Sequence, residues 1–176
     1  YLFLTNNSSR GVEGYIEKMR RLGIETERSD YLTSVDVTIA ALQRERPEKK
    51  CYVFGTRSFY SQLRDAGIPV TARPDPDVDI LLCGFDRELT FQKLEDACIL
   101  LNRGAEFWAT NPDWVCPTWY GSVPDCGSVC RMLTTATGRT PRFLGKPQPD
   151  MAVLAMARTG FAPEQTVLLG DRLYTD

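Results

Sequence analysis

Val167-Leu168-Leu169 runs directly into Gly170-Asp171-Arg172-Leu173-Tyr174-Thr175-Asp176, so an apolar stretch ends abruptly in a turn that carries two of the chain's carboxylates. A short apolar run that is bounded by Gly is typical of a buried strand. Polar residues behind such a strand lie at its carboxyl end, where open α/β sheets bind their ligands. The stretch therefore predicts a strand from Thr166 to Leu169 with a candidate site directly after it.

Two further segments repeat this arrangement. Leu2-Phe3-Leu4 runs into Thr5-Asn6-Asn7-Ser8-Ser9, and Arg142-Phe143-Leu144 runs into Gly145-Lys146-Pro147. If the three strands are neighbours in one parallel sheet, their polar ends meet at one edge of it. We therefore expect the hydroxyl of Thr5, the ammonium of Lys146 and the carboxylate of Asp171 to share a single pocket.

Strand-like and helix-like segments alternate through the rest of the chain. Further strands are expected at residues 51–54, 78–83 and 106–109, helices at 12–22, 38–46, 58–66, 91–101, 128–137 and 149–159, and a long irregular stretch at 110–126. This alternation predicts an α/β fold with largely parallel sheets. The chain opens within a predicted strand and stops directly after a polar motif, so we expect it to be part of a longer protein.

The composition excludes several kinds of site and partner. The chain has 176 residues, a net charge of −2 and no histidine. Without histidine there is no Ser-His-Asp triad and no His-ligated zinc, which leaves oxygen-ligated metals and carboxylate or phosphate chemistry. Lys and Arg are spread along the chain and its apolar runs are short, so neither nucleic acid nor a membrane is an expected partner. The six cysteines form no C-x-x-C pair, and we expect buried thiols in a reducing, cytoplasmic compartment.

The chemistry of the three polar motifs is complementary. Thr5 offers a hydroxyl, while Asn6 and Asn7 offer amides and backbone N–H groups that would open a helix, where anions bind favourably. Lys146 adds a fixed positive charge, and Asp171 and Asp176 add the oxygen ligands that Mg²⁺ prefers. Each motif alone is also compatible with a helix cap, a surface lysine or a turn. Together they describe a phosphoryl-transfer site.

The three motifs resemble those of a known family. T-N-N-S-S at 5–9, G-K-P-x-P at 145–149 and G-D-R-x-x-T-D at 170–176 are similar to the second, third and fourth motifs of haloacid dehalogenase superfamily phosphatases. The stretches 84–94 and 109–113 are also similar, most of all to the subfamily of para-nitrophenyl, NagD-type, phosphoglycolate and pyridoxal phosphatases. The resemblance covers essentially the whole chain and implies a Rossmann-like core with an inserted α/β cap of the C2 type.

The resemblance also implies domains, roles and partners. Residues 1–33 and 144–176 would form an incomplete core and residues 34–143 the cap. Thr5, Asn6, Asn7 and Lys146 would bind the phosphoryl group, Asp171 and Asp176 would hold Mg²⁺, and Asn111 and Asp113 would contact substrate. The substrate would be a small phosphorylated metabolite, hydrolysed through an aspartyl-phosphate intermediate. The family often dimerises through the cap, so the resemblance allows a homodimer as well as a monomer.

One departure from the family pattern is serious. Its first motif, D-x-D-G, supplies the nucleophile and the acid/base, and no such motif precedes Thr5 here. We therefore expect the 176 residues alone to be inactive. A phosphotransferase or phosphomutase of the same superfamily and a non-catalytic phosphate-binding relative remain alternatives. A response-regulator-like domain is disfavoured because more than a hundred residues separate Thr5 from Lys146.

Overall fold

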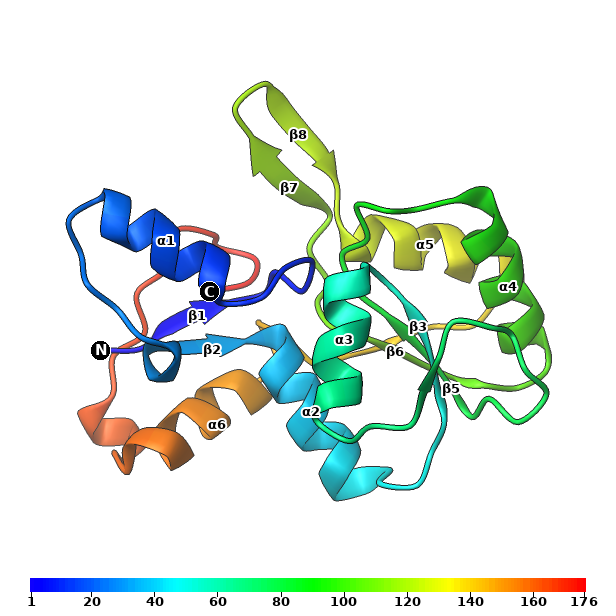
Figure 1. Ribbon diagram of the computed structural model, residues 1–176, viewed down its shortest axis with the longest axis horizontal. Helices are drawn as coiled ribbons and strands as arrows, with labels where there is room; N and C mark the ends of the chain where they lie inside the picture. Colours follow the sequence, from blue (N-terminus) through cyan, green and yellow to red (C-terminus); the bar gives the residue numbers. More distant parts are fainter.

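Two parallel sheets, one antiparallel hairpin and six α-helices make up the computed structural model, which describes residues 1–176 (Figure 1). The smaller sheet pairs β1 (Phe3–Thr5) with β2 (Tyr31–Thr33), so that Thr5 lies opposite Thr33. Helices α1 (Glu13–Arg21) and α6 (Asp150–Thr159) lie beside it. The α/β fold class expected from the sequence is confirmed.

The larger sheet contains five strands, all parallel, in the order β4-β3-β5-β6-β9. Its strands are β3 (Cys51–Phe54), β4 (Val70–Thr71), β5 (Ile80–Cys83), β6 (Glu106–Ala109) and β9 (Arg142–Phe143). All of them lie within residues 34–143, the range predicted for the cap. The division of the chain at 33 and 143 remains a prediction.

Helices cover both faces of the larger sheet. On one face α2 (Ser34–Glu45) and α3 (Arg57–Asp65) share a buried apolar cluster with alternate strand residues, including Val53, Leu82 and Trp108. On the other face α4 (Phe91–Asn102) and α5 (Cys126–Thr137) share a second cluster with the intervening residues, including Phe54, Leu81 and Phe107. Because both faces are buried, these strands read as continuous apolar runs, as expected for a parallel sheet.

Threonine side chains begin three of the helices. Thr33, Thr56 and Thr90 each accept a hydrogen bond from the backbone N–H three residues further on, at the start of α2, α3 and α4. Such caps satisfy donors that the first helical turn leaves free. The cap at Thr33 places α2 four residues earlier than the sequence predicted, because Asp36 completes a capping box with Thr33.

Two predictions for the secondary structure are wrong. The stretch 110–126 is not irregular, because β7 (Val115–Thr118) and β8 (Gly121–Pro124) form an antiparallel hairpin that projects from the molecule (Figure 1). Thr166–Leu169 is not a strand, since an apolar cavity of about 560 Å³ separates it from Tyr1–Leu4 and leaves it without a strand to pair with. The three motif-bearing segments therefore do not share one sheet, and β9 pairs with β6.

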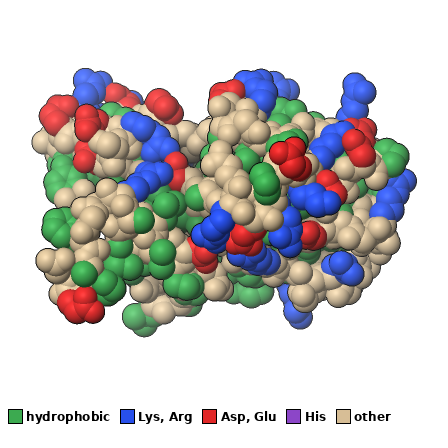
Figure 2. Space-filling model, turned by 90° about the horizontal axis from the view of Figure 1, so that it is seen from below, with side chains coloured by type: hydrophobic (Ala, Val, Ile, Leu, Met, Phe, Trp, Pro, Cys, Tyr) green, Lys and Arg blue, Asp and Glu red, His purple; other side chains and the backbone are tan.

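Most of the cysteines are buried, as the sequence predicted. Four of the six thiols are buried, and the sulfur atoms of Cys83, Cys126 and Cys130 pack together in the core. No helix is both long enough and apolar enough to cross a membrane. On the face in Figure 2, acidic and basic side chains are interspersed, without a patch of one sign.

Candidate functional site

A polar cleft of about 290 Å³ gathers residues from all three sequence motifs. Its lining includes Thr5, Asn6, Asn7, Lys146, Asp171 and Asp176, together with Leu4, Tyr15, Asp113, Cys116, Asp125, Arg172 and Thr175. The prediction that Thr5, Lys146 and Asp171 share one pocket is confirmed. Asn111 does not line the cleft, because its side chain is fully buried behind it.

Asn6 joins the end of the smaller sheet to the segment that follows the larger one. Its amide nitrogen donates to the Lys146 carbonyl at 3.0 Å, and its oxygen accepts from the Lys146 N–H at 2.9 Å. Gly145 permits this approach, since a Cβ there would lie 2.5 Å from the Thr110 carbonyl oxygen and 2.6 Å from the Asn6 oxygen. Asn6 thus positions the Lys146 backbone and also lines the cleft.

The loop after β1 is closed by its own side chains. The backbone N–H of Asn7 donates to the Thr5 hydroxyl at 3.2 Å, and the N–H of Ser9 donates to the Asn7 side chain at 2.8 Å. The helix predicted at 12–22 begins at Glu13, so the N–H groups of Asn6 and Asn7 do not open it as expected. The Asn7 side-chain NH₂ remains without an intramolecular acceptor and lies in the wall of the cleft.

Lys146 and Asp176 form an ion pair inside the cleft. Backbone N–H groups of Asp171 and Arg172 also donate to the Asp176 carboxylate, at 3.2 and 2.9 Å. Burial raises the pKa of Asp176, but the hydrogen bonds from Lys146 and from these N–H groups outweigh it and bring the pKa below its ordinary value. Asp176 is therefore held as an anion beside the Lys146 ammonium.

The carboxylates of the cleft are suitable ligands for a hard divalent cation. The Asp171 carboxylate is exposed and makes no ion pair or hydrogen bond, so it is free to take a ligand. Asp176 and Asp113 add further carboxylates, and one oxygen of Asp113 is buried without any partner. Carboxylate oxygens without imidazole ligands match the preference of Mg²⁺.

Asp113 and Arg172 connect the segment after β6 to the C-terminal motif. Their charged atoms lie 3.5 Å apart, and Arg172 also donates to the Val115 carbonyl at 3.5 Å. Burial raises the pKa of Asp113, and the Arg172 guanidinium only partly offsets this effect. The sequence identified Asp113 as a site residue but gave no signal for its arginine partner.

The comparisons with known proteins agree with this geometry. Family models described as haloacid dehalogenase-like hydrolase and HAD-hydrolase-like match residues 1–69 and 143–176. An acid sugar phosphatase of Staphylococcus aureus is 31% identical over all 176 residues, which span 67% of that protein. The chain belongs to the haloacid dehalogenase-like hydrolases. Within this family, its relatives named by activity are phosphatases.

Solved structures of this hydrolase family have the same fold. A 4-nitrophenylphosphatase from Thermotoga maritima superimposes with a TM-score of 0.92 at 34% identity, over 99% of this chain and 66% of its own. A glycerol phosphate phosphatase from Mycobacterium tuberculosis, solved in complex with magnesium, gives 0.92 at 31% identity, over 99% of this chain and 53% of its own. These likenesses support a phosphatase with the subfamily fold that the motifs implied.

Asp125 also lines the hydrolase's cleft, although no pattern in the sequence indicated it. Asp125 caps α5 by accepting from the Cys126 N–H at 2.6 Å, and it accepts from the Asn111 amide at 3.3 Å. Burial raises the pKa of Asp125 to about 6. A Pro-Asp step before a helix indicates a cap but not that the carboxylate faces a cleft, so only the fold could reveal it. Asn111, which does not line the cleft, contacts the lining residue Asp125 through this hydrogen bond.

Proposed function

We propose that the protein is a magnesium-dependent phosphomonoester hydrolase that acts on a small phosphorylated metabolite through an aspartyl-phosphate intermediate. The observation that carries the proposal is the polar cleft, where groups from three distant segments face one small volume: the Thr5 hydroxyl, the Asn7 amide, the Lys146 ammonium and the carboxylates of Asp171 and Asp176. Each is a group that phosphoryl transfer requires. The family and its phosphatase relatives support the reaction type.

The phosphoryl group would lie between Thr5, Asn7 and Lys146. The Thr5 hydroxyl and the Asn7 NH₂ would donate to phosphoryl oxygens, and the Lys146 ammonium would neutralise the charge that develops on them. Asn6 fixes the Lys146 backbone, so the ammonium is placed before substrate arrives. Pre-positioned donors of this kind contribute a large part of the rate in such sites.

The metal would be held by Asp171, with Asp176 ordering its water shell. Both carboxylates line the cleft together with Lys146. When bound, Mg²⁺ would add positive charge beside the transferring group and hold its orientation. Asp176 would serve the metal through its water shell while its Oδ1 pairs with Lys146 and its Oδ2 accepts from the backbone N–H groups of Asp171 and Arg172.

The nucleophile would come from a D-x-D-G segment ahead of Tyr1 in the whole protein. The cavity between Tyr1–Leu4 and Thr166–Leu169 is lined mostly by apolar side chains, and β1 pairs with β2 on one edge only. A strand placed there would pair with β1 and with Thr166–Leu169, and its carboxyl end would point its aspartates into the polar cleft.

The larger sheet and the hairpin would act as the cap over the cleft. Arg172 already contacts the Val115 carbonyl and Asp113 across the two parts. Closing such a cap excludes bulk water from the transferring group.

A phosphate-release screen of the full-length protein tests the proposal. We expect turnover of several phosphomonoesters with Mg²⁺ and its loss with a chelator, while these 176 residues alone release none. Turnover that is indifferent to Mg²⁺, or that persists in the Asp171→Asn and Lys146→Ala variants, would contradict it.

A further inference from the structure

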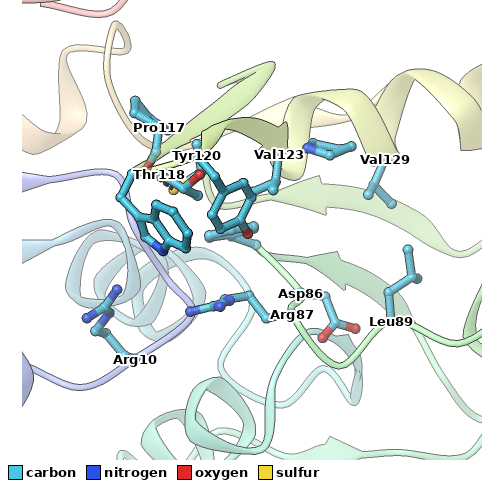
Figure 3. A pocket seen from close by; sticks show the side chains of 13 residues that line it. Arg10, Asp86, Arg87, Leu89, Pro117, Thr118, Tyr120, Val123 and Val129 are labelled. Carbon is cyan, nitrogen blue, oxygen red and sulfur yellow. Dashed lines mark hydrogen bonds between the residues drawn. The ribbon is translucent and has the colours of Figure 1, made fainter.

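A second cavity, which we name the hairpin pocket, adjoins the polar cleft. It has a volume of about 490 Å³ and lies between the β7–β8 hairpin, the segment 85–89 and Arg10 (Figure 3). Cys116 lines both the hairpin pocket and the polar cleft, so the two are neighbours. The volume falls in the range of small-molecule sites.

Two arginines without acidic partners face this pocket. Neither Arg10 nor Arg87 takes part in any ion pair or side-chain hydrogen bond of the structure, and Arg10 lies 5.8 Å from the ring of Tyr15, which lines the polar cleft. Figure 3 shows the Arg87 side chain extending toward Arg10 below the hairpin. Most other arginines pair with a carboxylate, so this pair of free cations at one cavity is unusual for the molecule.

The pocket's only carboxylate does not offset their charge. The side chain of Asp86 is fully buried and bonds to Lys93 at 2.7 Å and to the Glu88 N–H at 2.8 Å. Its charge is therefore already compensated, and the pocket keeps the positive charge of Arg10 and Arg87. A cavity with this balance attracts anions.

The opposite wall is apolar and aromatic. Trp119 and Tyr120 form the turn of the hairpin, with exposures of 95% and 61%, and Pro117, Val123 and Leu89 add aliphatic surface. Large aromatic side chains gain free energy when an organic body covers them. The pocket thus has a cationic wall on one side and an exposed apolar wall on the other.

We propose that the hairpin pocket binds the leaving group of the substrate, with a second anionic group of that leaving group held by Arg10 and Arg87 and its carbon body under the hairpin. The inference rests on the proposed function, because it takes the phosphoryl group to lie in the polar cleft. It names the substrate class: phosphomonoesters whose alcohol portion carries a carboxylate or a second phosphate, in preference to neutral alcohol phosphates. Arginine suits either group, since its planar fork donates two parallel hydrogen bonds.

The test compares matched substrates on the full-length protein. One pair is 2-phosphoglycolate against ethyl phosphate, which differ by a carboxylate; the other is a sugar bisphosphate against its monophosphate. The variants are Arg10→Met, Arg87→Met and, as a control, Arg131→Met, an exposed arginine of α5 outside the pocket. Methionine keeps the aliphatic stem and removes the charge.

We expect Arg10→Met and Arg87→Met each to lower kcat/KM for the anionic member of at least one pair by about 10- to 100-fold, which corresponds to one lost charge-assisted contact. The neutral member should change less than threefold, and Arg131→Met should change neither. Equal losses on both members, or no loss, would overturn the proposal. The pair that responds tells whether the anion is a carboxylate or a phosphate.

Binding measured by calorimetry on the same variants separates this proposal from the reaction. A preference for the anionic ligand that disappears in Arg10→Met and Arg87→Met, in a protein that turns over no phosphomonoester, would support the hairpin pocket and refute the hydrolase. Turnover without any such preference would support the hydrolase and refute the pocket.

Discussion

The side chain of Asn6 forms two hydrogen bonds with the backbone of Lys146, 140 residues away in the sequence: Nδ2 donates to the Lys146 carbonyl and Oδ1 accepts from its N–H. These two bonds join the end of β1 to the segment behind β9, although the strands belong to different sheets. The sequence suggested that Asn6 binds phosphate directly. The structure shows a further role, because one donor and the oxygen of this amide position the Lys146 backbone while Asn6 also lines the cleft.

Asn6→Ala should therefore cost stability as well as activity. It leaves a partly buried N–H and C=O of Lys146 without partners, which costs about 1–3 kcal/mol in the free energy of unfolding. Asn7→Ala is the matched control, because the side chain of Asn7 bonds only to Ser9 within its own loop. Urea unfolding of both variants measures the effect. Equal stability of the Asn6 variant and wild type would show that these two hydrogen bonds do not hold Lys146 in place.

Lys146→Ala should abolish most of the turnover of the full-length protein and leave the fold intact. The ammonium is the cation of the cleft that pairs with Asp176, and removing one pre-positioned charge from such a site lowers kcat by about 10²–10³-fold. Lys18→Ala is the control, because Lys18 is exposed on α1. Circular dichroism should match wild type in both variants. A Lys146 variant with normal kcat would remove this residue from the site.

Asp171→Asn should change the magnesium requirement before it changes anything else. Its carboxylate has no partner within the chain, so the substitution breaks no internal contact. We expect the Mg²⁺ concentration for half-maximal activity to rise at least about tenfold, with unchanged thermal unfolding in the absence of metal. Glu164→Gln, an exposed carboxylate outside the cleft, should leave the magnesium curve where it was. A magnesium dependence of Asp171→Asn that equals that of the wild type would contradict the metal assignment.

The sequence predicted best where a local pattern decides the structure. Cys51–Phe54 and Glu106–Ala109 are strands with the predicted bounds, because short apolar runs of this kind are typical of parallel strands that are buried on both faces. The sequence-based prediction was wrong where a distant pairing partner decides whether a segment becomes a strand. Thr166–Leu169 is equally apolar but has no neighbouring strand, and Val115–Thr118 forms a strand despite a proline because Gly121–Pro124 pairs with it.

The candidate site divides in the same way. Thr5, Lys146 and Asp171 could be predicted to converge, since each follows an apolar run and carries phosphoryl chemistry. The partnership of Asn6 with Lys146 and the approach of Asp125 to the cleft depend on tertiary contacts that leave no periodic trace in the sequence. Arg10 and Arg87 are likewise ordinary surface arginines until the hairpin is placed above them.

Gly145→Ala tests the close approach between the two parts. The added Cβ would lie 2.5 Å from the Thr110 carbonyl oxygen, which is backbone and cannot turn away. We expect a loss of about 1–3 kcal/mol in the free energy of unfolding. Gly14→Ala on α1 is the opposite control, because its Cβ meets only the flexible Arg10 side chain at 3.3 Å and alanine favours a helix by about 0.5–1 kcal/mol. Two variants of equal stability would show that position 145 has room.

Asp125→Asn should stabilise the protein near neutral pH. Because burial raises the pKa of Asp125 to about 6, the folded state holds a proton that the unfolded state releases near its ordinary value of 3.8. The folded state therefore binds more protons between these two values, so the contribution of Asp125 to stability falls as the pH rises from about 4 to about 6. Above that window the charged, buried carboxylate costs about 3 kcal/mol, at 1.36 kcal/mol for each pKa unit. Asparagine keeps the cap to Cys126 and can still accept from Asn111, but it carries no charge.

Urea unfolding at pH 4 and pH 7 measures this effect. At pH 4 the variant and the wild type should have nearly equal stabilities, and at pH 7 the variant should be more stable. A difference that is independent of pH would mean that Asp125 does not titrate in this window, and a less stable variant at pH 7 would mean that its charge stabilises the cleft.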